Sequence, residues 1–244
     1  MDIHLSPWYF GPMQFFSLPP LIRGIAFDID KTLYNNDFYA RNQIDLLIER
    51  FAQERGESAS DTRTTILRWQ EEYARANDGA RQSLGNTFAA LGVPIQTSVT
   101  WREELIHPEH YLEADEHLAT ALEELAREYR LVAVTNNPVR VGRATLESLG
   151  VAGYFPHVVG LDTTLRSKPD PAAFRSAVEI LECDPGQAVS VGDRYEVDIQ
   201  PALSLGMGGV LVDGVQDVYL LPRALREERR LEARRDHGID RATE

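Results

Sequence analysis

Residues 24–33 read Gly-Ile-Ala-Phe-Asp-Ile-Asp-Lys-Thr-Leu, a short apolar run that ends in two carboxylates and a hydroxyl. Because side chains two apart in an extended strand point to the same side, Asp28 and Asp30 are expected to converge beyond the end of a buried strand. Two close carboxylates repel each other unless a cation neutralises them or one of them holds a proton. The stretch therefore indicates a metal site or a pair of catalytic carboxylates, with a polar loop after a buried strand as the alternative.

Polar residues also follow two further apolar runs. A basic loop lies between these two runs. These residues are Thr135 and Asn136 after the run 131–134, Lys168 within the loop 166–170, and Gly192, Asp193 and Asp198 after the run 188–191. Near-continuous apolar strands that alternate with helical segments indicate an α/β fold, a doubly wound parallel sheet covered by helices on both faces. Ligands bind such sheets outside the carboxyl ends of the strands, so all of these polar groups are expected along one edge.

Together these residues resemble the motifs of the haloacid dehalogenase-like superfamily, in its phosphatase branch. The four motifs of that family appear in order as Asp28-Ile29-Asp30-Lys31-Thr32, then Thr135, then Lys168, then Gly192-Asp193 with Asp198. The resemblance covers residues 21–36 and 112–222, which are the expected Rossmann-like catalytic core. It implies a phosphoric monoester hydrolase, and the order of all the motifs carries this assignment because each motif alone is common.

The resemblance and the chemistry of phosphoryl transfer together imply a role for each motif. Asp28 would be the nucleophile that forms an aspartyl-phosphate, and Asp30 would be the general acid and base. Thr135, Asn136 and Lys168 would hold the phosphate oxygens. Taken alone, Thr135 and Asn136 are equally typical of a turn at the end of a strand.

Hard carboxylate oxygens without organised His or Cys ligands favour Mg²⁺ as the cofactor. By resemblance, its protein ligands would be the Asp28 carboxylate, the Asp30 backbone carbonyl and Asp193. Asp198 would support the site by orienting Lys168 or a metal-bound water. Asp198 also stands at the start of a helix expected over residues 198–205, and the two roles can coexist.

Residues 37–111 interrupt the alternation of strands and helices. Apolar side chains recur there at helical spacing, which predicts an all-helical insert. These side chains are Phe38, Ile44, Leu47, Ile48, Phe51, Ile66, Trp69, Tyr73, Leu84, Phe88 and Leu91. In the resembled family an insert at this place is a mobile cap that closes over the phosphate and reads the leaving group. Tyr34, Asn35 and Tyr39 lie at the hinge beside the first motif and are candidates for substrate specificity.

The two ends of the chain fall outside the expected core. Residues 1–20 form an N-terminal extension that is rich in aromatic residues and proline and lacks the pattern of a signal peptide. Such an extension either packs on the domain or a partner, or is a loosely ordered leader. Residues 223–244 alternate acidic and basic side chains, which predicts a charged tail that is a solvated helix or disordered.

The 244 residues carry a formal net charge of −13 at pH 7. Nucleic acids and anionic membranes bind basic surfaces, so this charge argues against both as partners. No apolar run approaches the roughly 18 residues that cross a membrane. The single cysteine, Cys183, cannot form an internal disulfide and is expected as a small core residue of a cytoplasmic protein. These properties favour a small phosphorylated metabolite as partner and leave the oligomeric state open.

Several activities share the four motifs of the resembled family. A dehalogenase does not need an acid two residues after the nucleophile, so Asp30 favours phosphate chemistry. The ending Thr32-Leu33-Tyr34, followed by a helical cap, resembles capped nucleotidases and phosphoglycolate-type phosphatases. We therefore expect a Mg²⁺-dependent phosphatase of a small soluble phosphomonoester. A sugar-phosphate mutase is an alternative because it keeps all four motifs, and a non-catalytic binding or scaffold protein would predict a damaged motif.

Overall fold

The computed structural model describes residues 13–77, 79 and 82–236. Its centre is a six-stranded sheet with the strand order β1-β6-β5-β2-β3-β4. The strands are β1 (Gln14–Phe16), β2 (Gly24–Phe27), β3 (Arg130–Val134), β4 (Val158–Val159), β5 (Ala188–Gly192) and β6 (Gly208–Leu211). Strands β2 to β6 pair in parallel, and β1 pairs with β6 in the antiparallel direction. The predicted α/β fold with a parallel sheet is thereby confirmed, with one antiparallel edge strand added.

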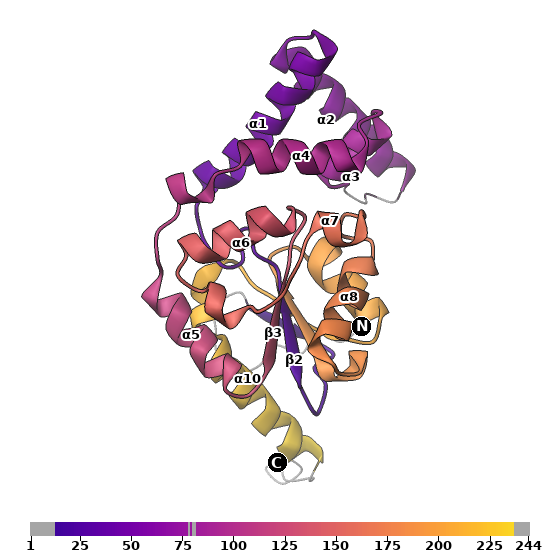
Figure 1. Cartoon of the computed structure of the whole chain (residues 1–244). Helices are drawn as coiled ribbons and strands as arrows, with labels where there is room; N and C mark the ends of the chain where they lie inside the picture. Colours follow the sequence, from indigo (N-terminus) through magenta and orange to yellow (C-terminus); the bar gives the residue numbers. More distant parts are fainter. Residues whose placement is uncertain (1–12, 78, 80–81, 237–244) are drawn as a thin grey trace.

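Helices cover both faces of the sheet and form a separate layer beyond its carboxyl edge (Figure 1). The helices are α1 (Asp37–Arg55), α2 (Ala59–Ala76), α3 (Leu84–Ala90), α4 (Ile95–Leu105), α5 (Glu116–Ala126), α6 (Val139–Ser148), α7 (Leu161–Thr164), α8 (Ala172–Leu181), α9 (Gln200–Ser204) and α10 (Val215–Asp236). Short 3₁₀ turns are η1 (Pro108–His110), η2 (Ala152–Tyr154) and η3 (Pro185–Gln187), and η4 (Tyr195–Ile199) is a π-helical turn. The helix expected over 198–205 is therefore divided into η4 and α9.

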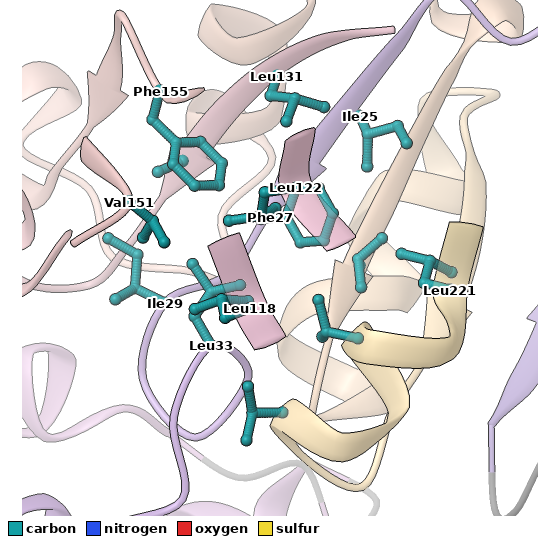
Figure 2. Close-up of a cluster of buried hydrophobic side chains, with 14 of the residues drawn as sticks. Ile25, Phe27, Ile29, Leu33, Leu118, Leu122, Leu131, Val151, Phe155 and Leu221 are labelled. Carbon is teal, nitrogen blue, oxygen red and sulfur yellow. The ribbon is translucent and has the colours of Figure 1, made fainter. Parts of the chain in front are cut away.

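Alternate residues of the central strand serve the two faces of the sheet, as the two-residue period of a strand requires. Phe27 packs in one cluster with Leu118 and Leu122 of α5 and Leu221 of α10, as Figure 2 shows. Ala26, its neighbour in β2, belongs to a second cluster on the opposite face, built with helices α8 and α9. Because β2 lies between β3 and β5, the loops that follow these three strands meet at one place.

Strand β1 and helix α10, which belong in part to the two terminal segments, pack against the core. Strand β1 continues the sheet beyond β6, and Met13 is buried. Helix α10 runs through the expected boundary at residue 222 and buries Ala224 and Leu225 against the sheet. These two apolar side chains anchor the first turns of the segment that was expected to be a solvated tail. The aromatic residues Trp8, Tyr9 and Phe10, together with residues 237–244, lie outside the described residues.

Helices α1 to α4 form the predicted helical insert, and they have a core of their own. Its buried side chains are Leu47, Ile48, Phe51, Ile66, Phe88, Val93 and Trp101. Two of the residues found at helical spacing are instead exposed, since Phe38 and Ile44 keep 64% and 45% of their surfaces. Helix α4 packs against α6 and α7, so the insert rests on the core above the carboxyl ends of the strands. None of the described helices is long and apolar enough to span a membrane.

Candidate active site

Asp28 stands directly after the central strand and is nearly inaccessible to solvent. Its backbone N–H extends the β2–β5 ladder by donating to the Val191 carbonyl at 2.8 Å. Its Oδ1 accepts a hydrogen bond from the Lys168 ammonium at 2.6 Å, and its Oδ2 accepts one from the Thr32 hydroxyl at 3.1 Å. The carboxylate is therefore fixed in one orientation by a buried cation and a buried hydroxyl.

Lys168 is the buried cation of the site. Its ammonium donates to Asp28 and Asp198 at 2.6 Å each, and to the Val134 carbonyl at 3.0 Å. Burial lowers the pKa of Lys168, but the charges of Asp198 and Asp28 outweigh burial, so the pKa is raised and the ammonium stays charged. Three acceptors of fixed geometry use all three of its N–H groups.

Asp193 and Asp198 complete an acidic cluster with Asp28. Oxygens of the three carboxylates all lie within 4.8 Å of one another. Asp198 is packed closely against β5, because a Cβ atom at Gly192 would lie 2.4 Å from the Cβ of Asp198. Only glycine fits at this position, which explains the residue type that precedes Asp193.

Asp193 differs from its neighbours because its buried Oδ1 makes no hydrogen bond in the described part of the chain. The nearest cationic group is the Arg194 Nε, at an ion-pair distance of 3.5 Å. Burial and then the charge of Asp28 raise the pKa of Asp193 to about 7. An unsatisfied carboxylate oxygen beside two further carboxylates fits a hard divalent cation, which takes oxygen ligands and would offset this repulsion.

The Asp30 side chain joins a different group of residues. It accepts hydrogen bonds from the Tyr34 hydroxyl at 2.7 Å and from Gln43, Thr135 and Asn137 at 3.1 Å each. The hydrogen-bond partners of the Asp30 side chain are therefore different from those of Asp28. Strand β2 ends at Phe27, so the alternation of an extended strand does not reach Asp30.

Gln43 and Asn137 are polar residues of this group that the sequence analysis missed. Gln43 lies on α1 of the insert, is buried, and donates to both Asp30 and the Tyr34 hydroxyl. Asn137 follows β3 and donates to Asp30 and, at 2.9 Å, to the Gln43 side chain. A polar residue between Tyr39 and Leu47 on the buried stripe of α1 was the available signal, since its neighbours at four-residue spacing are apolar.

Asn136 holds the loop that carries Lys168. Its side-chain oxygen accepts from the Lys168 backbone N–H at 2.7 Å, and its amide donates to the Lys168 carbonyl at 3.2 Å. This side chain is thus engaged with protein backbone, where a phosphate ligand was expected. The residue before Lys168 is Ser167, whose hydroxyl forms a hydrogen bond of 2.8 Å with the hydroxyl of Ser83 in the insert.

The three specificity candidates occupy different environments. Tyr34 bonds to Asp30, as described above, and its ring lies 5.5 Å from that of Tyr39. Tyr39 is buried, and its hydroxyl has no hydrogen-bond partner in the described structure. Asn35 instead bonds to Gln216 at 2.5 Å and accepts from the Val215 N–H at 3.3 Å, both on α10. Asn35 therefore fixes the start of α10.

A family model described as haloacid dehalogenase-like hydrolase matches residues 22–206. The chain belongs to this family. Phosphoglycolate phosphatase from Salmonella choleraesuis is 30% identical to it over 206 residues, which are 78% of this chain and 80% of that protein. N-acylneuraminate-9-phosphatase from Rattus norvegicus is 32% identical over 97 residues, so this match spans only 40% of the chain and 39% of that protein.

Among solved structures, a HAD phosphatase from Thermococcus onnurineus is similar, with a TM-score of 0.52 and 26% sequence identity. The similarity covers 76% of this chain and 84% of that one. The predicted family and its helical insert after the first strand are confirmed, as is the prediction of a hydrolytic enzyme. The two relatives from Salmonella choleraesuis and Rattus norvegicus are both named as phosphatases.

Proposed function

We propose that this family member is a Mg²⁺-dependent phosphatase that hydrolyses a small soluble phosphomonoester through an aspartyl-phosphate on Asp28. The observation that carries the proposal is the fixed Asp28 carboxylate, held by Lys168 at the end of the central strand beside the unsatisfied Asp193. The relatives named for phosphoglycolate and for an N-acylneuraminate 9-phosphate support a small phosphorylated metabolite as substrate. The net charge and the single cysteine of the chain agree with a substrate dissolved in the cytosol.

In the first step, an Asp28 oxygen forms a bond to phosphorus and the bond from phosphorus to the ester oxygen breaks. The electron pair goes to the leaving oxygen, which takes a proton from the Asp30 carboxyl group. Asp30 has to release some of its four hydrogen bonds to reach that oxygen. Since one of those bonds comes from Gln43 of the insert, the position of the insert would govern when the acid is available.

In the second step, a water molecule attacks phosphorus and loses its proton to the Asp30 carboxylate. The bond from phosphorus to the Asp28 oxygen breaks, its electron pair returns to Asp28, and inorganic phosphate leaves. Lys168 would offset the negative charge of Asp28 and of the phosphate through both steps, while Asn136 keeps Lys168 in place. Thr135 would turn its hydroxyl from Asp30 to a phosphate oxygen. Asp198 orients the Lys168 ammonium from the opposite side.

Asp28, the backbone carbonyl of Asp30 and Asp193 would hold the metal ion. When bound, Mg²⁺ supplies positive charge that offsets the charge of the phosphate and of the carboxylates. The unsatisfied Asp193 oxygen is the feature of this chain that supports the assignment.

A screen of phosphorylated metabolites with Mg²⁺ present tests the proposal. Release of inorganic phosphate from one class of monoester, lost on chelation, is the expected result. Isomerisation of a sugar phosphate without net release of phosphate would instead indicate a mutase. Binding without turnover of any compound, including an activated aryl phosphate, would contradict both and favour a scaffold.

A further inference from the structure

Arg102 of helix α4 is a buried cation that has no carboxylate partner in the described part of the chain. Only 5% of the residue is exposed. Its Nη1 donates to the Ser98 carbonyl at 3.1 Å and to the Ser98 hydroxyl. Among the residues that the structure describes, Ser98 alone accepts hydrogen bonds from the guanidinium, through Nη1, and no ion pair joins it to a carboxylate. Buried arginines are ordinarily paired, because an uncompensated charge away from water is costly.

The guanidinium lies where the insert meets the catalytic core. The Cβ position of Gly85 is 3.7 Å from Arg102 Nη2 and also 3.7 Å from the Ser167 hydroxyl oxygen. Ser167 is the residue before Lys168. Figure 1 shows α3 and α4 across from α6 and α7, over the carboxyl end of β3. The unpaired edge of Arg102 is therefore close to the loop that carries the buried lysine of the site.

Gly85 leaves this edge of the arginine uncovered. A methyl group at this position would lie in ordinary contact with both Arg102 and Ser167 and would fill part of the space between them. The charge itself persists at neutral pH: burial lowers the pKa of Arg102 to about 10, and the charge of Asp30 opposes that shift.

We propose that Arg102 binds a carboxylate on the leaving group of the substrate, so that the enzyme prefers phosphate esters of small hydroxy acids. This inference rests on the proposed phosphatase function. A guanidinium presents a planar pair of N–H donors that matches a carboxylate, and a substrate carboxylate would supply the missing partner of the buried charge. One unpaired guanidinium suits a monoanion better than a second phosphate dianion, which needs more positive charge.

Two matched substrate pairs test this inference on the wild-type protein. 2-Phosphoglycolate is compared with 2-hydroxyethyl phosphate, and 3-phosphoglycerate with glycerol 3-phosphate, because each pair differs only in a carboxylate against a hydroxymethyl group. p-Nitrophenyl phosphate reports the phosphatase activity itself. We expect the acid of at least one pair to have a kcat/KM about 10- to 100-fold higher than its neutral partner, the range of a charge-assisted hydrogen-bonded contact.

Arg102→Gln should remove most of this preference by raising KM for the acid, with a much smaller effect on the neutral ester. Arg102→Lys keeps the positive charge but loses the planar pair of N–H donors, so this variant should retain part of the preference for the acid. Arg50→Gln is the matched control, since Arg50 lies on α1 of the insert and is already paired with Glu54 and Glu104. That variant should keep the preference of the wild type.

Each result bears on one proposal. Hydrolysis of p-nitrophenyl phosphate by a wild type that shows no preference for the acid in either pair would overturn the carboxylate site and leave the phosphatase standing. An unchanged preference in Arg102→Gln would do the same. If a two-carbon bisphosphate were preferred over phosphoglycolate, the site would belong to a second phosphate and the carboxylate assignment would fail. A wild type inactive on all of these esters would instead count against the phosphatase.

Discussion

Asp28 and Asp30 are separated by one residue, yet their side chains enter two different hydrogen-bonded groups. Asp28 is held by Lys168 and Thr32, and the Asp30 side chain by Tyr34 and by residues from the insert and from the loop after β3. The first group is anchored to the sheet and the second reaches into the insert. A nucleophile needs a fixed position, and in the proposed mechanism Asp30 has to exchange some of these partners for the leaving oxygen.

Asp28→Asn should lower turnover on the order of 10⁴-fold or more, because the nucleophile is lost while the shape of the side chain is kept. The amide can still bond to Thr32 and occupies the same volume, and Lys168 keeps Asp198 as a carboxylate partner, so the variant should still fold. Phosphate release by the purified variant measures the effect. Full activity in a folded Asp28→Asn protein would sink the assignment of the nucleophile.

Asp30→Asn should slow phosphoenzyme formation more for a poor leaving group than for a good one. Protonation of the leaving oxygen matters most for a sugar or alkyl phosphate and least for an activated aryl phosphate, and general acid catalysis typically contributes about 10²- to 10⁴-fold. Single-turnover rates of phosphoenzyme formation with both ester types measure the difference. Equal losses for the two substrates would mean that Asp30 is structural and that the acid lies elsewhere.

At the scale of elements, the site depends on strands that end at the same edge of the sheet. The side chains after β2, β3 and β5 could be predicted to meet there, because parallel neighbouring strands bring their carboxyl ends together. The partners of Asp30 could not be predicted in the same way. Gln43 comes from α1, whose periodicity predicts a helix but not the direction in which that helix crosses the core. The burial of Ala224 and Leu225 could not be predicted either, because the residues that follow them are mostly charged.

The packing of α5 on β2 can be tested by Leu122→Ala. Leu122 is fully buried in the cluster around Phe27, so its truncation should lower the free energy of unfolding by about 2–5 kcal/mol. Leu67→Ala on α2 is the matched control, because Leu67 is 52% exposed and should change little. Urea unfolding monitored by circular dichroism gives both values. Equal stability of the two variants would contradict the described core.

At the scale of the whole molecule, the insert and the core meet around the proposed site. The hydroxyls of Ser83 and Ser167 are 2.8 Å apart across this boundary, and Gln43 bonds to Asp30 from the same side. The order of the four motifs was sufficient to predict the α/β fold, since three of them follow β2, β3 and β5 and Lys168 lies in the loop before α8. The contacts between the two parts needed the structure, because side chains that meet across a boundary carry no shared sequence pattern.

Chelation should abolish activity, and Mg²⁺ should restore it. The carboxylates of Asp28, Asp193 and Asp198 lie within 4.8 Å of one another, so the site needs added positive charge beyond Lys168 and Arg194. Excess Ca²⁺ should inhibit, because it imposes a larger and looser coordination shell than Mg²⁺. Phosphate release after exhaustive chelation and metal addition measures both effects. An unchanged rate in the chelated protein would refute the metal requirement.

The covalent intermediate on Asp28 is the central claim, and it can be observed directly. Asp30→Asn protein mixed with p-nitrophenyl phosphate should release one burst of nitrophenol and then stall, because the same carboxylate is needed to activate water. Rapid acid quenching followed by peptide mass spectrometry should then find one phosphoryl group on the peptide that contains Asp28. A phosphoryl group on any other residue, or a burst with no phosphorylated peptide at all, would contradict the account.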